Sequence, residues 1–346
     1  MDAISKWPVP HARSHRPALL TMKGSKGVDM RILVVGAGAT GGYFGGRLAA
    51  AGRDVTFLVR EARAEQLRKD GLVIRSPHGG DLTLRDPKTV TREALESQSV
   101  QPFDVVLLSC KAYDLDNAID SFAAAVGPQT VILPLLNGMR HLDVLQARFG
   151  TQAVLGGVCL IASTLNDKRE IVHLNDAHAI TFGELGNGVS PRVQAIADTF
   201  SNAGFNVKAS AQILQEMWEK WVFLATLAGS TCLFRAPVGV IVATPDGAAT
   251  VERLFAECRT VAAEHDHAVR DSFVERSRAM LFATGSTLTA SMLRDVQNGA
   301  RIEADHVLGD LIRRGGAAQR ASSELSVLRI VYSQLKAYEA QRPEAG

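Results

Sequence analysis

The chain has 346 residues, a length at which two domains are expected. Its 38 Lys and Arg residues nearly balance its 36 Asp and Glu residues, so it lacks the basic excess typical of nucleic-acid-binding proteins. No apolar run reaches the roughly 18–20 residues that a membrane-spanning helix needs. The four cysteines lie in apolar stretches without a CxxC motif, a pattern typical of reduced thiols. We therefore expect a cytoplasmic protein whose partners are neither nucleic acids nor membranes.

Residues 1–29 differ from the rest of the chain. They are basic, contain scattered prolines and glycines, and lack the apolar core of a secretory signal. We expect a disordered extension, or an upstream start codon with the functional start at Met30, which leads directly into the first strand. An organelle-targeting segment is a further alternative.

A glycine motif follows the first predicted strand, which begins at Arg31, and a small-residue helix through Ala51 comes after it. The six residues of the motif are Gly36, Ala37, Gly38, Ala39, Thr40 and Gly41. In this strand–turn–helix context the pattern is a dinucleotide-binding fingerprint. The first glycine allows the tight turn, the second lets backbone approach a pyrophosphate, and the third lets the helix pack on the strand. The sequence therefore predicts a dinucleotide cofactor here, the alternative being a fold that no longer binds one.

The second strand predicts which dinucleotide is bound. It runs from Asp54 and ends at Arg60, where NAD-binding proteins place an acid on the ribose 2′-hydroxyl group, and Arg63 follows closely. A guanidinium fits a 2′-phosphate instead, so the sequence predicts NADP(H). Two alternatives stay open: a small shift in register would place Glu61 there, or Arg60 is simply solvated.

The remaining elements of the first half alternate between helices and strands, which predicts a Rossmann-type doubly wound parallel sheet over residues 30–208. Lys111 follows the buried strand 104–110, and Asn137 follows the strand 130–136. Ligands collect beyond the carboxyl ends of such strands. In chain order we expect a helix at 61–69, strands at 72–75 and 82–85, helices at 114–126 and 139–149, a strand at 153–160, β segments at 171–174 and 179–183, and a helix at 190–203.

From residue 209 to 340 helical periodicity dominates, which predicts an all-helical domain for substrate binding and dimerisation. A homodimer through this domain is an expectation at the level of the fold alone. The expected helices span 211–234, 246–265, 271–282, 287–298, 300–315 and 322–340.

The helical half contains the candidate catalytic residues. Lys220 lies between Trp218 and Trp221, so we expect it to be partly desolvated; the alternative is a surface lysine whose methylene groups cover tryptophan. Ser291 and Asp295 lie one helical turn apart on one face. Glu303 begins an amphipathic stretch and could be a first-turn glutamate that the helix dipole favours.

No metal site is predicted. The run Glu264-His-Asp-His267 has suitable residue types, but side chains two residues apart on a helix diverge by about 200°. His173 and His178 are interpreted as surface or hydrogen-bonded histidines.

Four blocks in this order resemble the ketopantoate reductases, also called 2-dehydropantoate 2-reductases. The resemblance covers about residues 30–340 and includes the glycine motif. The other blocks are Lys111-Ala-Tyr, Asn137-Gly-Met, and Trp218-Glu-Lys220 with the later Ser291-Met-Leu-x-Asp295 and Glu303.

This resemblance implies roles for matching residues. Lys220 would donate a proton to the keto oxygen of the substrate, and Glu303 would hold the substrate hydroxyl group. Ser291 would bind the substrate carboxylate, with Asp295 beside it, and Asn137 would lie near nicotinamide and substrate. Arg60 and Lys111 would contact the 2′-phosphate.

The chain departs from the family pattern after the lysine. Leu224 and Ala228 stand where family members usually carry asparagines that bind the polar hydroxy-keto acid. A leucine offers no hydrogen bond, which alters substrate discrimination.

The sequence therefore predicts NADPH-dependent reduction of a 2-oxo acid, 2-dehydropantoate or a close analogue, to a 2-hydroxy acid. One alternative is a related reductase for a more apolar keto substrate, and another is a non-catalytic NADP(H)-binding regulator. A β-hydroxyacid dehydrogenase that uses NAD would conflict with Arg60.

Overall fold

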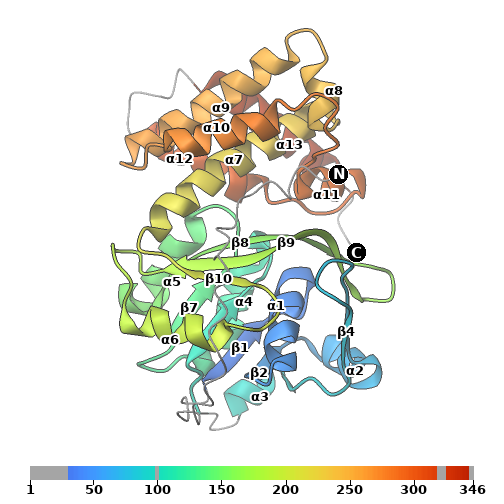
Figure 1. Cartoon of the computed structure of the whole chain (residues 1–346), viewed down its shortest axis with the longest axis vertical. Helices are drawn as coiled ribbons and strands as arrows, with labels where there is room; N and C mark the ends of the chain where they lie inside the picture. Colours follow the sequence, from blue (N-terminus) through green and yellow to red (C-terminus); the bar gives the residue numbers. More distant parts are fainter. Residues whose placement is uncertain (1–29, 98–100, 318–324, 343–346) are drawn as a thin grey trace, which may run out of the picture.

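A computed structural model describes residues 30–97, 101–317 and 325–342. Figure 1 shows a parallel α/β domain below and a helical domain above, which confirms the predicted fold class. The expectations for residues 1–29 lie outside the described residues. Within the described ranges, none of the helices combines the length and hydropathy needed to cross a bilayer.

The central sheet has five parallel strands in the order β5-β2-β1-β6-β7. Their side chains are apolar in near-continuous runs, because helices cover both faces of a parallel sheet. Because all five strands are parallel, their carboxyl ends meet at the same edge of the sheet. The bounds are β1 Arg31–Val35, β2 Asp54–Leu58, β5 Thr89–Val90, β6 Val105–Leu108 and β7 Val131–Pro134.

Five helices accompany this sheet. The predicted helix 114–126 is shorter than expected, because 3-10 turns at Ala112–Asp114 and Ala123–Ala125 flank α4. The bounds are α1 Ala39–Ala50, α2 Glu61–Asp70, α3 Arg92–Ser97, α4 Leu115–Phe122 and α5 Arg140–Phe149.

A second sheet lies against α1, and the sequence did not predict it as a separate unit. Its path is β10-β9-β3-β4, with β8 paired antiparallel to β9. The predicted strand 153–160 begins instead at residue 156, after a 3-10 turn, and β10 was missed. The bounds are β3 Leu72–Arg75, β4 Leu82–Leu84, β8 Gly156–Leu165, β9 Ile171–Gly183 and β10 Asn206–Ala209, with α6 Pro191–Phe200 between β9 and β10.

Strand β9 corrects another prediction, because its 13 residues join the two segments expected at 171–174 and 179–183. The residues between the two expected segments, including the polar Asn175 and Asp176, belong to the same strand. In the structure the pairing with β8 shifts register between Ile161 and Ser163. The Asn175 side-chain oxygen accepts a hydrogen bond from the backbone N–H of Ala162, 3.0 Å away, so a polar side chain satisfies the irregular backbone and the strand continues.

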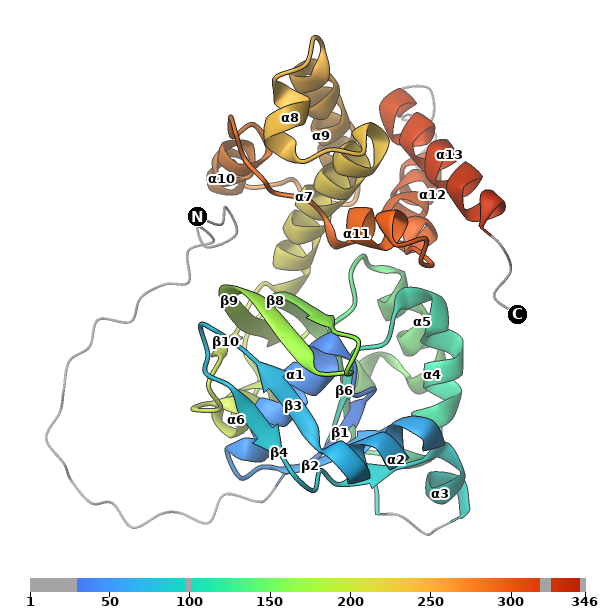
Figure 2. The same cartoon turned by 90° about the vertical axis from the view of Figure 1, so that its right-hand side faces the viewer.

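The helical domain is organised around α7 Ile213–Phe234, which begins against β8 and continues between α9 and α13 (Figures 1 and 2). The short helix α8 was missed. The predicted helix 287–298 begins only at residue 291, and the one predicted at 300–315 contains a π-helical turn, Asp305–Gly309. The other bounds are α8 Val238–Val242, α9 Gly247–Glu264, α10 Asp271–Leu281, α11 Ser291–Gln297, α12 Asp310–Ala317 and α13 Ser326–Gln341.

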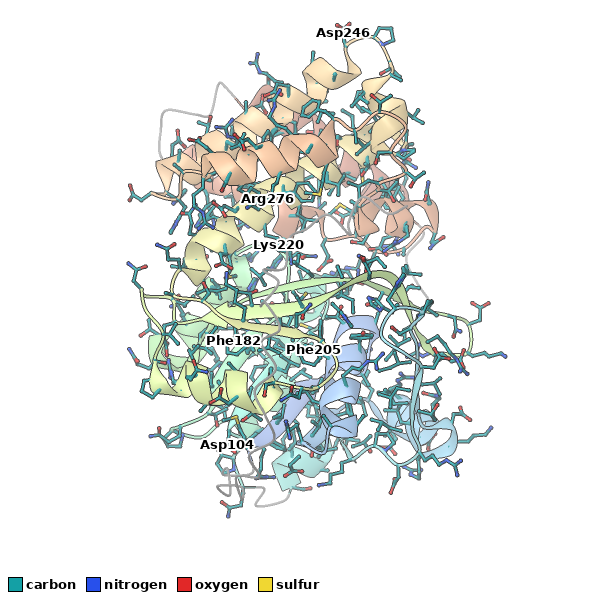
Figure 3. The ribbon with its side chains drawn as sticks, viewed as in Figure 1. Asp104, Phe182, Phe205, Lys220, Asp246 and Arg276 are labelled. Atoms are coloured by element: carbon teal, nitrogen blue, oxygen red, sulfur yellow. The ribbon has the colours of Figure 1, made fainter. Side chains whose placement is uncertain are left out.

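One hydrophobic cluster connects the two domains. It includes Leu33 and Ile132 of the sheet, Trp221 of α7 and Leu254 of α9. The base of α7 is therefore held firmly against the α/β domain, and Lys220 lies where the two domains meet (Figure 3).

Candidate active site

The glycine motif forms a turn from β1 into α1 whose geometry fits a dinucleotide. Gly36 has a φ of +92°, a conformation that side chains disfavour. A β-carbon on Gly41 would lie 2.1 Å from the Ser109 hydroxyl and 2.5 Å from the Gly36 carbonyl, so α1 packs tightly on the sheet only with glycine there. A β-carbon on Gly38 would meet nothing within 4 Å, which leaves an open approach to the backbone.

The start of α1 adds to this fit. Gly38 is the N-cap residue and supplies no side-chain cap, so the first N–H groups of the helix, including those of Ala39 and Thr40, suit an anion. The residues present therefore fit the pyrophosphate of a dinucleotide cofactor.

Arg60 lies just beyond the carboxyl end of β2, as the N-cap residue of α2. Its side chain is exposed, and no ion pair of its guanidinium is found among the described residues. Glu61 is the first residue of α2 and is also exposed. The position of Arg60 suits a 2′-phosphate, and this role stays a prediction.

Lys111 belongs to a cluster of charges that joins the two domains. Its Nζ atom lies 3.0 Å from Asp295 Oδ2 of α11 and 3.6 Å from Glu303 Oε2. Burial lowers the pKa of Lys111, but Glu303 and Asp295 outweigh burial and raise the pKa above its ordinary value. Lys111 follows β6, which β1 separates from β2 in the sheet. The structure thus places Lys111 in an interdomain ion cluster, and its contact with a 2′-phosphate stays a prediction.

Glu303 is held at the same junction. Its Oε1 atom accepts a hydrogen bond from the Ala112 backbone N–H at 2.9 Å, and its side chain is only 12% exposed. It also lines a polar cavity of about 190 Å³ with Tyr113, Arg140 and His306.

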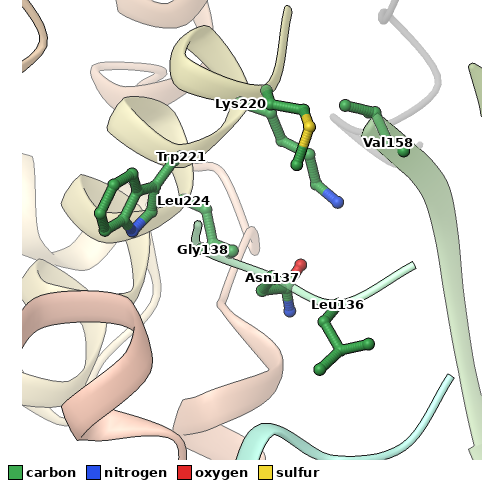
Figure 4. A pocket seen from close by; sticks show the side chains of 9 residues that line it. Leu136, Asn137, Gly138, Val158, Lys220, Trp221 and Leu224 are labelled. Carbon is green, nitrogen blue, oxygen red and sulfur yellow. The ribbon is translucent and has the colours of Figure 1, made fainter. Parts of the chain in front are cut away.

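Lys220 lines a different pocket, at the base of α7. Its Nζ atom donates to the Cys159 carbonyl of β8 at 2.9 Å, and the side chain is half-buried. Figure 4 shows its amine pointing toward the side of the pocket where Asn137 lies. The pocket is lined by Leu136, Asn137, Gly138, Gly157, Val158, Met217, Lys220, Trp221 and Leu224.

The neighbouring tryptophans are core residues. Trp221 is buried and donates its indole N–H to the Val307 carbonyl of the π-helical turn at 2.9 Å. Trp218 is also buried and stacks against His265 and His267. The two histidines of the run from Glu264 to His267 therefore pack on the indole ring of Trp218. No group of three or more His, Cys, Asp or Glu side chains within the described residues is placed to hold a metal ion.

The predicted site residues thus form two groups. Lys220 and Asn137 share one pocket, whereas Lys111, Asp295 and Glu303 form the interdomain cluster. In the described part of the chain no hydrogen bond or ion pair joins Lys220 to Glu303. Ser291 is exposed at the start of α11 and lines neither cavity.

Leu224 and Ala228, the two departures from the family pattern, lie in different surroundings. Leu224 lines the Lys220 pocket, whereas Ala228 is buried in the helical core and does not line it. The prediction that both positions face the substrate is therefore supported for Leu224 only.

Two buried side chains near these sites differ from what the sequence indicated. Arg63 of α2, noted beside Arg60 in the sequence, is 9% exposed and donates to the Ala37 carbonyl of the glycine motif. His141 of α5 is completely buried and was not singled out, because it lies in no recognisable motif.

The comparisons agree in both halves of the chain. The family described as "Ketopantoate reductase PanE/ApbA" matches residues 32–187, and "Ketopantoate reductase PanE/ApbA C terminal" matches residues 212–339. The chain is 40% identical to the uncharacterized oxidoreductase YkpB of Bacillus subtilis (strain 168), over 90% of this chain and 100% of that protein.

Two solved structures extend the comparison. The 2-dehydropantoate 2-reductase from Methylococcus capsulatus is similar with a TM-score of 0.79 and 29% identity, over 91% of this chain and 99% of that one. A D-mandelate dehydrogenase determined with NADH and anilino(oxo)acetate shares the fold, with a TM-score of 0.77 and 21% identity, over 90% and 99% of the two chains.

Proposed function

Because this chain belongs to the ketopantoate reductase family, we propose that it reduces a 2-oxo acid to a 2-hydroxy acid with NADPH. The first candidate substrate is 2-dehydropantoate, which would yield pantoate. The observation that carries the proposal is the Lys220 amine, held half-buried in a pocket with Asn137. This pocket follows β7, at the same edge of the sheet as the glycine motif.

The chemistry requires a hydride at C2 and a proton at the keto oxygen. When bound, the reduced nicotinamide supplies the hydride. Lys220 has three N–H donors, of which one is held by the Cys159 carbonyl, so two remain for the keto oxygen. As negative charge grows on that oxygen, Lys220 stabilises it and transfers a proton to it, and the amine then regains a proton from solvent. Asn137 would orient the substrate from the opposite side of the pocket.

NADPH preference can be tested at Arg60. Replacing Arg60 by Ser should raise the dissociation constant for NADPH by about 10- to 100-fold, because a charge-assisted phosphate contact is lost. The dissociation constant for NADH should stay unchanged. Titration followed by nucleotide fluorescence measures both values, and an equal loss for the two cofactors would contradict this assignment.

Leu224 favours a second candidate, a keto acid with a more apolar side chain. It stands in the Lys220 pocket with Met217 and Val158, and a leucine cannot hydrogen-bond a substrate hydroxyl group. The test compares NADPH consumption on 2-dehydropantoate with a panel of aliphatic and aromatic 2-oxo acids. Replacing Leu224 by Asn should shift the ratio of kcat/KM values toward 2-dehydropantoate by about tenfold or more.

The same measurement of NADPH consumption distinguishes between the candidate functions. Faster turnover of an apolar acid than of 2-dehydropantoate supports the second candidate. Absence of turnover across the panel, with NADPH still bound, would favour a non-catalytic NADP(H)-binding regulator. Replacing Leu224 by Met serves as the matched control, because it keeps an apolar side chain of similar volume at the same position.

A further inference from the structure

Arg63 presents a buried positive charge that forms no ion pair with a carboxylate among the described residues. Its side chain is 9% exposed, and the partners of its guanidinium in this part of the chain are neutral oxygens. Nη2 donates to the Ala37 carbonyl at 2.9 Å, while Nη1 donates to the Gln66 side chain and to the Arg169 carbonyl, 3.4 Å away. Its Nε atom has no partner among the described residues. Buried charges are costly unless paired, so this arrangement calls for a functional reason.

The hydrogen bond from Arg63 to the Ala37 carbonyl supplies that reason. Ala37 lies between Gly36 and Gly38 in the glycine motif, and its carbonyl shares a planar trans peptide group with the N–H of Gly38. In such a group the C=O and the N–H point in opposite directions. When Arg63 holds the Ala37 carbonyl, the Gly38 N–H must point away from Arg63. A β-carbon on Gly38 would meet nothing within 4 Å, so this part of the backbone is open to a ligand.

The hydrogen bond from Arg63 to the Arg169 carbonyl reaches the hairpin between β8 and β9. Arg169 has a φ of +62°, and the turn around it is set by Asn166. Asn166 Oδ1 accepts from the N–H groups of Lys168 and Glu170, at 3.1 and 2.9 Å, and its Nδ2 donates to Glu170 Oε2 at 2.8 Å. Glu170 is in turn paired with Arg75 of β3 at 2.8 Å. The Arg169 carbonyl is therefore held by the second sheet, and Arg63 connects it to the glycine motif.

We infer that Arg63 is a positioning residue for the cofactor, which turns the Gly38 N–H toward the pyrophosphate and depends on the β8–β9 hairpin for its own orientation. This inference rests on the proposed dinucleotide cofactor. It differs from the role of Arg60, because the pyrophosphate is common to NADPH and NADH whereas the 2′-phosphate is not. Figure 2 shows the hairpin lying in front of α1, the helix that the glycine motif begins.

The first test measures the dissociation constants of NADPH and NADH for the whole chain by calorimetry, first on the wild type and then on Arg63→Gln and Arg63→Lys. Both variants should weaken NADPH and NADH equally, by about tenfold. Lysine keeps the charge, but its single ammonium cannot reproduce the planar fork that reaches two carbonyls. The exposed Arg68 lies on the same helix, so Arg68→Gln is the matched control and should bind as wild type.

The second test changes the β8–β9 hairpin rather than Arg63 itself. Asn166→Ala removes the turn contacts and should also weaken both cofactors, although residue 166 lies 103 positions from Arg63 in the sequence. In the Arg63→Gln background the same change should have no further effect, because the two act through one connection. The exposed neighbour Asp167, changed to Asn, is the control for the hairpin. At saturating NADPH the kcat of each variant should equal that of the wild type, while KM for NADPH rises.

Each other outcome is informative. Wild-type affinity in Arg63→Lys or Arg63→Gln overturns the inference, and so does a loss confined to NADPH, since that would place Arg63 on the 2′-phosphate. Additive effects of Asn166→Ala and Arg63→Gln overturn the link through the hairpin. If Arg63→Gln unfolds, as judged by thermal denaturation, Arg63→Lys and Asn166→Ala decide the question. A wild type that binds neither cofactor contradicts the proposed function itself.

Discussion

Replacement of Lys220 by Ala should lower kcat by about 10³-fold or more while the dissociation constant of NADPH stays within about twofold of the wild type. General acid catalysis contributes roughly 10²- to 10⁴-fold, and a cation aimed at the developing alkoxide adds electrostatic stabilisation. Lys220 lines the pocket with Asn137 and is not part of the glycine motif, so cofactor binding should be preserved. Single-turnover measurement of NADPH oxidation reports the chemical step, and calorimetry reports the affinity.

Two further variants make this result specific. Lys208 of β10 is exposed and pairs with Glu216 of α7 at 2.9 Å, so Lys208→Ala should keep full activity. Lys220→Arg keeps the charge but changes the shape and cannot release a proton readily, and it should recover only a small part of the rate. Turnover of Lys220→Ala at the wild-type rate would exclude Lys220 as the general acid.

His141 should make the folded protein sensitive to acid. Its side chain is completely buried, neither ring nitrogen has a hydrogen-bond partner among the described residues, and the basic side chains of His306, Lys220 and Arg314 disfavour a positive charge on it. Burial, helped by these neighbours, lowers the pKa of His141 to about 3. The folded protein therefore keeps His141 neutral, whereas the unfolded chain takes up a proton below about pH 6.5.

The sign of the effect follows from this difference. Below about pH 6.5 the unfolded state binds one more proton than the folded state, so the free energy of unfolding falls as the pH decreases. The slope approaches about 1.4 kcal/mol per pH unit for one histidine, and the loss between pH 6.5 and 4.5 is about 2.3 kcal/mol, since the unfolded histidine is only half protonated at pH 6.5. Burial also lowers the pKa of His173, His178 and His306, so the wild-type slope should exceed that of one group.

Replacing His141 by Leu should reduce the slope of the free energy of unfolding against pH by the contribution of one proton. The change replaces two unsatisfied ring nitrogens with apolar atoms of similar volume, so stability at pH 7.5 should be equal or higher. Urea unfolding at pH 7.5, 5.5 and 4.5 measures the slope, and His78→Gln, at an exposed position, serves as the control. A His141→Leu variant with the wild-type slope would show that His141 is protonated in the folded state.

The cofactor half of the molecule could be predicted from sequence because its signals are local. The strand, the turn and the start of α1 occupy consecutive residues, and Gly36 and Gly41 meet their steric needs within this short stretch and the adjacent strand. The buried parallel strands were recognised by their continuous apolar runs, and α7 by its length and periodicity. These features depend on backbone conformation and burial, which neighbouring residues determine.

The arrangement of the site depended on contacts between residues far apart in the chain. Lys111 was expected on the 2′-phosphate, and only the folded structure brings it to Asp295, 184 residues later. The segments expected at 171–174 and 179–183 form one strand, because Asn175 satisfies an irregularity of the backbone that arises only when β8 and β9 pair.

The sequence by itself determined the family, the parallel α/β fold with its helical second domain, and the candidate residues on the glycine motif and α7. The tertiary structure alone decided that Lys111 lies beside Asp295 and Glu303 and that Arg63 connects the glycine motif to the β8–β9 hairpin. The physical reason is that periodicity and turn chemistry report which face of an element is buried. They do not report which distant oxygen will meet a buried cation, since that depends on how the two sheets and the two domains pack together.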